Sequence, residues 1–252
     1  MPTARMFDEG VIGVTIYDGT PDQKITITSS PYEWLEASFF YTNIQGKPYP
    51  GFEFQDYKDK GFNFKIRLKE EGIFPAIAVG INDIAGTGYY SSEYIVGSYG
   101  IDNLDIHFGL GYGTLNGSNK SFKNPLSYLH DSFSNRPTNY EELGGQFQPS
   151  RYFSGKDVSP FYGISYALNE KFLLKFEHDS TKTDGLIEYE IPGKRESIAV
   201  EYKFNKNFTI GVAKERDNFF SLKFIYKQDA SVSNNSFKYK KVAKKEDDSK
   251  FN

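Results

Sequence analysis

Residues 61–113 read GFNFKIRLKEEGIFPAIAVGINDIAGTGYYSSEYIVGSYGIDNLDIHFGLGYG, and this stretch decides the fold. In residues 62–68 every second side chain is large and apolar, and the side chains between them are an amide or cations. Residues 104–112 repeat the pattern with acidic, histidine and glycine residues in the alternate positions. Side chains alternate across a β-strand, so each segment has one apolar face and one polar or small face. Segments of this kind recur along nearly the whole chain and predict the wall of an antiparallel transmembrane β-barrel.

The composition agrees with a barrel and excludes a helical membrane protein. The chain has 252 residues, 38% of them hydrophobic, and a mean hydropathy of −0.56. No run approaches the roughly 20 apolar residues of a membrane helix, whereas a barrel strand needs only alternate residues to face lipid. The net charge of −3 gives no indication of nucleic-acid binding, and the absence of cysteine excludes disulfides. Aromatic residues make up 17%, which suits either interfacial bands or a soluble β core.

The alternation predicts about twelve strands, each of a length suited to a tilted crossing of the bilayer. They are residues 10–17, 24–30, 34–43, 62–70, 74–83, 93–99, 104–113, 160–168, 171–178, 196–205, 207–214 and 218–227. A polar loop is predicted at residues 44–60, and the longest irregular segment is loop 114–157. A loop of that length usually has a function, and it either stays outside the lumen or folds inward and plugs it.

The connections alternate between short and long, as in outer-membrane barrels with short periplasmic turns and longer external loops. The short link at residues 215–217 departs from the rule. Aromatic residues form two bands, with Trp34 and Tyr166 near the inner rim and Tyr41 and Tyr112 near the outer one. A soluble two-sheet sandwich that buries the same apolar faces is the alternative.

We predict a barrel over residues 1–227, followed at 228–252 by a charged periplasmic linker or a disordered tail. The first five residues lack the apolar core of a signal peptide. An outer-membrane location therefore requires that a signal was removed or that the chain is part of a longer protein.

Catalytic motifs are weak. His107 shares a strand face with Asp105 and can form a general-base or metal-orienting pair, although a hydrogen-bonded lumen pair is the commoner arrangement. The run His178-Asp179-Ser180 has the residue types of a hydrolase, but adjacent strand residues point to opposite faces. The sequence contains no nucleophile-elbow motif, P-loop or zinc-ligand spacing. We therefore predict no catalytic residues, no metal site and no cofactor.

The inward-facing polar residues are the better candidates for a binding surface. Strand parity turns them toward the lumen, where they either pair with one another or form a cationic surface that attracts anionic polysaccharide. The candidates for lumen or polysaccharide contact are Lys65, Arg67, Lys69, Asp105, His107, Lys175, Glu177, Lys203 and Lys223. Lys227, Glu36 and Glu201 belong to the same face.

Several motifs carry a family resemblance. They are Pro2-Thr3-Ala4-Arg5, Trp34-Leu35-Glu36-Ala37, Tyr57-Lys58-Asp59-Lys60-Gly61-Phe62 and Ala85-Gly86-Thr87-Gly88 followed by Ser91-Ser92-Glu93-Tyr94. Together they resemble the YjbH/GfcD family of exopolysaccharide- and capsule-associated outer-membrane proteins, most clearly over residues 1–113 and more diffusely over 158–227. None of the motifs is a catalytic signature. The resemblance implies a barrel that works with a secretion system, and longer members with further periplasmic and barrel regions.

Three functions follow as hypotheses. The first is a non-enzymatic outer-membrane component of exopolysaccharide or capsule biosynthesis and export. Its partners would be outer-membrane lipid, anionic polysaccharide and other secretion proteins, with no nucleic acid. The second is a general porin-like or adhesion barrel. The third is an outer-membrane hydrolase of lipid or glycan, which His107→Ala or His178→Ala would inactivate.

Overall fold

The computed structural model describes residues 1–49, 51–118, 120–137, 147–182, 194–216 and 219–230. Within them, twelve antiparallel strands form a closed barrel, as the alternation predicts. The barrel strands are β1 (Val11–Asp18), β2 (Asp22–Tyr32), β3 (Leu35–Tyr49), β4 (Phe52–Lys69), β5 (Ala76–Ile84), β6 (Ser92–Ile101), β7 (Leu104–Gly111), β9 (Asp157–Ala167), β10 (Phe172–His178), β11 (Glu196–Lys203), β12 (Phe208–Glu215) and β13 (Phe219–Asp229). A two-residue strand, β8 (Phe122–Lys123), pairs with the start of β9 outside this wall.

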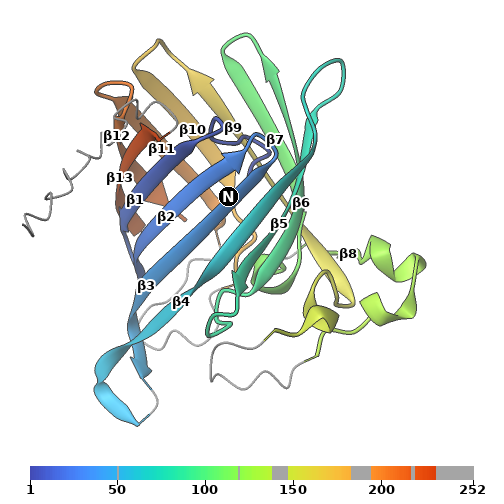
Figure 1. Cartoon of the computed structure of the whole chain (residues 1–252). Helices are drawn as coiled ribbons and strands as arrows, with labels where there is room; N and C mark the ends of the chain where they lie inside the picture. Colours follow the sequence, from blue (N-terminus) through green and yellow to red (C-terminus); the bar gives the residue numbers. More distant parts are fainter. Residues whose placement is uncertain (50, 119, 138–146, 183–193, 217–218, 231–252) are drawn as a thin grey trace, which may run out of the picture.

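Each strand pairs with its neighbours along the chain, and two further pairings close the barrel (Figure 1). The first strand meets the last, with Val11 opposite Asp229 and Asp18 opposite Leu222. β7 pairs with β9, with Leu104 opposite Tyr166, so the long connection between them leaves the wall continuous. Among the described residues, closure gives each of the twelve wall strands a partner on both sides, as a protein surrounded by lipid requires.

The two ends of the barrel differ. At one end, here called the short-turn end, β2–β3, β6–β7 and β9–β10 are joined by brief turns (Figure 1). At the other end, the long-loop end, the β3–β4 hairpin protrudes beyond the wall, and the β7–β9 connection carries four 3₁₀ helices. These are η1 (Gly113–Leu115), η2 (Pro125–Tyr128), η3 (Asp131–Phe133) and η4 (Pro149–Arg151).

The barrel is apolar outside and largely polar inside. On the outer face, Ile16, Ile27, Phe64 and Ile106 are 38–47% exposed, whereas a water-soluble β-sandwich would bury side chains of this kind. Their inward-facing neighbours include the buried Glu36 and His107. A band of exposed aliphatic and aromatic side chains around a closed wall is the surface that a lipid bilayer covers. No helix among the described residues is long and apolar enough to cross a membrane.

Two expectations from the sequence are wrong. The predicted polar loop at 44–60 is a hairpin, because β3 continues to Tyr49 and β4 begins at Phe52, with Ile44 opposite Tyr57. Two register shifts in this hairpin hide the continued alternation from a reading of the sequence. Tyr112 is fully buried against Phe153, with ring centroids 5.4 Å apart, and so does not belong to an outer aromatic band. The tail expected after residue 227 lies outside the described residues from position 231 onward; β13 itself extends to Asp229.

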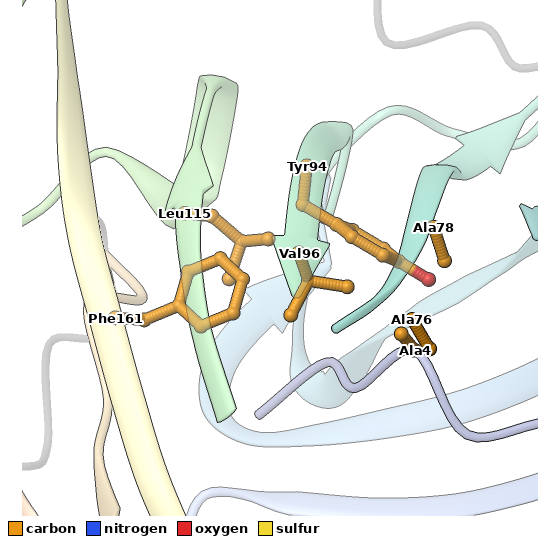
Figure 2. Packing of buried hydrophobic residues seen from close by; sticks show 7 residues of the cluster. All are labelled: Ala4, Ala76, Ala78, Tyr94, Val96, Leu115 and Phe161. Atoms are coloured by element: carbon orange, nitrogen blue, oxygen red, sulfur yellow. The ribbon is translucent and has the colours of Figure 1, made fainter. Parts of the chain in front are cut away.

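One side of the lumen holds an apolar cluster (Figure 2). Tyr94 and Val96 of β6 lie between Phe161 of β9 and the alanines of β5, with Leu115 of η1 alongside. Ala4, from the start of the chain, lies beside Ala76. The cluster therefore joins the barrel wall to a segment that is not part of it.

Candidate functional site in the barrel lumen

The N-terminal segment, residues 1–9, runs inside the barrel. Its contacts reach inward-facing side chains on strands around the whole wall: Glu36 on β3, Ser98 on β6, Asp105 on β7, Glu177 on β10 and Lys227 on β13. A segment that touches strands on every side of a closed barrel must lie in its lumen, and Figure 1 marks the chain start there. The first residues of the chain thus occupy part of the lumen, whereas the sequence offers loop 114–157 as the segment that could fold inward.

Arg5 is the main anchor of this segment. Its Nε and Nη2 donate to the two carboxylate oxygens of Asp105 at 2.7 and 2.5 Å, and its Nη1 pairs with Glu71 in the β4–β5 turn. Such a bidentate arginine–carboxylate pair fixes both position and orientation. Hydrogen bonds from Gly100 and Arg5 lower the pKa of Glu71. The backbone of the segment is also held, since the Ala4 amide donates to Ser98 Oγ at 2.9 Å.

A second anchor involves Lys65 and Glu36. Their side chains form an ion pair of 2.5 Å inside the barrel, and both are largely buried. Lys65 Nζ donates to the carbonyl of Arg5 at 2.5 Å, and Glu36 accepts from the amide of Phe7 at 2.6 Å. This pair therefore provides hydrogen-bond partners for the Arg5 carbonyl and the Phe7 amide, which would otherwise be unsatisfied in the lumen.

The remaining predicted lumen residues separate into interior and rim positions. Lys175 and Lys223 both contact Glu201, at 2.8 and 2.5 Å, and Glu177 accepts from the amino group of Met1 at 2.6 Å. At the short-turn end, Arg67 pairs with Glu70, Lys69 lies over the ring of Phe74, and Lys203 is exposed. The interior members have the geometry of charge pairing; a role for any of the nine toward polysaccharide stays a prediction.

His107 is placed in an unexpected constellation. Its Nδ1 lies 2.8 Å from Ser98 Oγ and its Nε2 3.7 Å from Asp105, so the three residue types of a hydrolase triad lie close together. Ser98 is only 1% exposed, however, and its oxygen accepts from the Ala4 amide. With the N-terminal segment in place, no substrate carbonyl can approach Ser98, so this geometry does not support nucleophilic catalysis.

The run from His178 to Ser180 is dispersed, as strand alternation predicts. His178 stacks on Tyr162 at 4.7 Å, Asp179 binds Arg216, and Ser180 donates to the carbonyl of Leu115 at 2.6 Å. Within the part of the chain that the structure describes, no group of three or more His, Cys, Asp or Glu side chains could hold a metal ion.

Beside the N-terminal segment the lumen holds a cavity of about 690 Å³. Met1, Pro2 and Thr3 form part of its wall. The charged side chains that line it are of both signs: the cations are Lys24, Lys175, Arg216 and Lys223, and the anions are Asp22, Glu177, Asp179, Glu201 and Glu215. The cavity thus has charges that are close to balanced, set among apolar side chains such as Phe40 and Phe176, and it is of a size that admits about one or two sugar rings.

A buried ion pair fastens the β7–β9 connection over the long-loop end. Glu93 at the start of β6 is fully buried, and Arg136 donates to its two oxygens at 2.7 and 2.9 Å. The amide of Phe153 donates to the same carboxylate at 2.9 Å, and Arg136 also reaches the carbonyl of Arg151. One carboxylate therefore organises two separate parts of the connection.

Asp179 should make the stability of the barrel pH-dependent. Burial alone would raise the pKa of Asp179, but Arg216 and the hydrogen bonds from Thr181 lower it to about 2. Because the folded pKa lies below the unfolded value, the stabilisation is complete above the unfolded pKa and is lost as pH falls from about 4 to about 2; it amounts to about 2 kcal/mol. Thermal unfolding in detergent at several pH values measures this loss of stability. The variant Asp179→Asn should lose less stability than the wild type between about pH 4 and about pH 2. If the variant and the wild type lose the same stability over this pH range, Asp179 is not the group responsible.

Sequence reasoning missed Arg5, Ser98, Glu93 and Arg136. Arg5 stands in a segment with no alternation, and Arg136 in an irregular loop, so neither has a strand face to indicate its direction. Ser98 shares the inward parity of Tyr94 and Val96 on a predicted strand, and this parity was the signal that could have found it. Glu93 has the opposite parity, so strand alternation gives no signal for its contact with the β7–β9 connection.

Known proteins resemble the chain in sequence and in fold. Lipoprotein YjbH of Escherichia coli (strain K12), described as uncharacterized, is 31% identical over 230 residues, which is 87% of this chain but only 32% of that protein. The chain therefore spans about a third of the length of this relative. Among solved structures, the KdgM porin aligns with a TM-score of 0.48 and 11% identity, covering 86% of this chain and 98% of the porin. The NanC porin gives 0.43 and 10%, covering 86% and 98%.

The likeness to these porins concerns the barrel architecture alone. The family comparison is more informative, because the family described as YjbH, exopolysaccharide biosynthesis protein, matches residues 1–250. The match includes the N-terminal segment and the whole wall of the barrel. The chain belongs to the YjbH family of exopolysaccharide biosynthesis proteins.

Proposed function

We propose that the chain is a non-enzymatic outer-membrane barrel that takes part in the biosynthesis and export of an exopolysaccharide or capsule. The observation that carries the proposal is the family match over residues 1–250, on a closed barrel whose outer face is apolar and whose lumen is polar. Its membrane partner is lipid, and its further partners are an anionic polysaccharide and other proteins of the secretion system.

The geometry of the lumen supports a binding role over a chemical one. The cavity is lined by charged and hydroxyl side chains beside apolar ones, and the polar groups can bind a hydrated polymer through exchangeable hydrogen bonds. The serine nearest to a catalytic arrangement, Ser98, is closed off by Ala4. Hydrolysis therefore ranks below binding and passage.

A general porin is the second candidate, favoured by the closed twelve-strand wall. The N-terminal segment weighs against it, because an open diffusion pore does not need a segment anchored by Arg5 to two carboxylates in its lumen. Ion conductance separates the two functions: a general porin conducts steadily without glycan, whereas the proposed component conducts poorly until the segment moves.

A genetic experiment tests the proposal. Deletion of the gene should lower the secreted or surface polysaccharide of the bacterium, and the full-length gene should restore it. Colorimetric assay of hexose and uronic acid measures the polysaccharide, and uptake of small solutes serves as the control. Unchanged polysaccharide together with impaired solute uptake would contradict the export role and favour the porin.

A further inference from the structure

A continuous row of aromatic rings leads from the exposed tip of the β3–β4 hairpin to the connection between β5 and β6 at the lumen. Phe52 and Tyr49 at the tip have centroids 6.3 Å apart, Tyr49 and Tyr57 5.9 Å, and Tyr57 and Tyr89 5.7 Å. Tyr89 meets Tyr90 edge-on at 5.0 Å. We call these five residues, with the two lysines described next, the aromatic track.

The two lysines lie over the faces of these rings. Lys47 Nζ is 4.6 Å from the ring of Tyr89 and 5.1 Å from that of Tyr57, and Lys24 Nζ is 4.4 Å from the ring of Tyr90. Neither lysine forms a salt bridge with a side chain that the structure describes. The interior lysines 65, 175 and 223, by contrast, all have carboxylate partners. The aromatic track thus combines ring faces with two lysines, of which Lys24 also interacts electrostatically with Asp59 and Asp83.

The track faces inward and ends at the cavity. Ile44 and Tyr57 lie opposite each other and are 0% and 4% exposed, whereas Tyr41 on the other face is 43% exposed, so Tyr57 belongs to the inner face of the hairpin. Lys24 and Tyr90 line the cavity, where the Tyr90 hydroxyl binds Asp22. Figure 1 shows this hairpin projecting beyond the wall at the long-loop end. Its tip is accessible, since Tyr49 and Phe52 are 40% and 65% exposed.

We infer that the aromatic track binds an anionic polysaccharide chain and directs it between the outside and the luminal cavity. The flat apolar face of a pyranose ring packs on an exposed aromatic ring, and Tyr49 and Phe52 provide such rings at the tip of the hairpin. Lysines over the rings provide the charge that a uronate or sulfate group requires. The inference rests on the proposed function, for which it supplies the ligand class and the contact residues.

Packing within the hairpin alone does not account for these features. Ring–ring contacts that serve only to stabilise the hairpin gain most when they are buried, yet the two rings at the tip remain exposed. Stabilisation alone also gives no reason for two lysines without salt bridges over the row. A ligand that has both an apolar face and a negative charge would contact the exposed rings and the lysines together.

Titration calorimetry in detergent micelles, on the full chain, tests the inference with oligogalacturonate as the probe. The double variant Tyr49→Ala/Phe52→Ala should weaken binding about tenfold and Lys47→Gln about threefold. The matched controls are Phe54→Ala, a fully exposed ring of the same hairpin, and Lys58→Gln, a lysine that contacts Asn43 on the opposite face. Both should stay within about twofold of the wild type. Heat-modifiable gel migration identical to the wild type establishes that each variant is folded.

Two comparisons overturn the inference. If polyglutamate binds as tightly as oligogalacturonate, charge alone explains the binding and the stacking role of the rings is wrong. If oligogalacturonate fails to bind, or binds the track variants and the wild type equally, the aromatic track is not the site. Neither outcome contradicts the proposed function, which the deletion experiment tests separately. The proposed function is wrong if polysaccharide export does not depend on the gene.

Discussion

Replacing Arg5 with alanine should release the N-terminal segment and raise the ion conductance of the barrel at least about twofold. The variant leaves Asp105 and Glu71 without the guanidinium that both now contact. Repulsion between these carboxylates and the loss of the bidentate pair both disfavour the docked segment. The contacts of Met1, of Ala4, of the backbone carbonyl at position 5 and of Phe7 remain, and they then have to offset the conformational entropy of ordering the segment without the arginine pair.

Cysteine labelling detects the release of the N-terminal segment without a conductance measurement. The chain contains no cysteine, so Ala4→Cys introduces a unique thiol at a position that is 1% exposed. A membrane-impermeant maleimide should label it slowly in otherwise wild-type protein and much faster when Arg5→Ala is added. Arg67→Ala is the matched control, because it removes an arginine of the same end whose partner is the exposed Glu70. Rapid labelling of Ala4→Cys alone would contradict the luminal position of the segment.

Replacing Arg136 with alanine should cost about 3 to 5 kcal/mol in the docking of the β7–β9 connection, because it leaves a fully buried carboxylate unpaired. Glu93 would keep the Phe153 amide as a hydrogen-bond donor but lose the charge that balances it. An exposed ion pair such as Arg67–Glu70 contributes under about 1 kcal/mol, so Arg67→Ala again serves as the comparison.

Hydrogen exchange measures that docking energy directly. Peptides covering residues 124–136 and 151–156 should exchange about a hundredfold faster or more in Arg136→Ala, while peptides from β10 and β12 keep their protection. Adding Glu93→Gln should recover much of the loss, since the carboxylate that lacks a partner becomes a neutral amide. Unaltered exchange in the single variant would contradict the structural role of the pair.

The wall of the barrel could be predicted from the sequence because it depends on a local rule. Residues 62–68 and 104–110 alternate without interruption, and period-2 alternation determines both the strand and its inward face. The inward direction of Lys65, Lys175, Glu177 and Lys223 follows from the same rule, and the structure places all four inside. The hairpin at 44–60 could not be predicted because register shifts between Ile44 and Tyr49 break the period.

The contents of the lumen could not be predicted in the same way. The Arg5–Asp105 pair joins residues 100 positions apart, and Arg136–Glu93 joins residues 43 apart, with an irregular segment on one side of each pair. No periodicity relates such positions, and the contact forms only once the barrel has closed around the segment. Lys47 of the aromatic track could not be predicted for a related reason, since it lies in the region predicted as a loop.

Refolding of the full chain tests the central claim, a transmembrane barrel, most directly. The protein is diluted from urea into buffer with and without detergent micelles or lipid vesicles, and is followed by far-UV circular dichroism and by gel migration before and after heating. We expect a β spectrum and a heat-dependent shift in migration that require detergent or lipid, because the exposed apolar band of the barrel needs a hydrocarbon environment. A folded, monodisperse protein in plain buffer would contradict the membrane assignment.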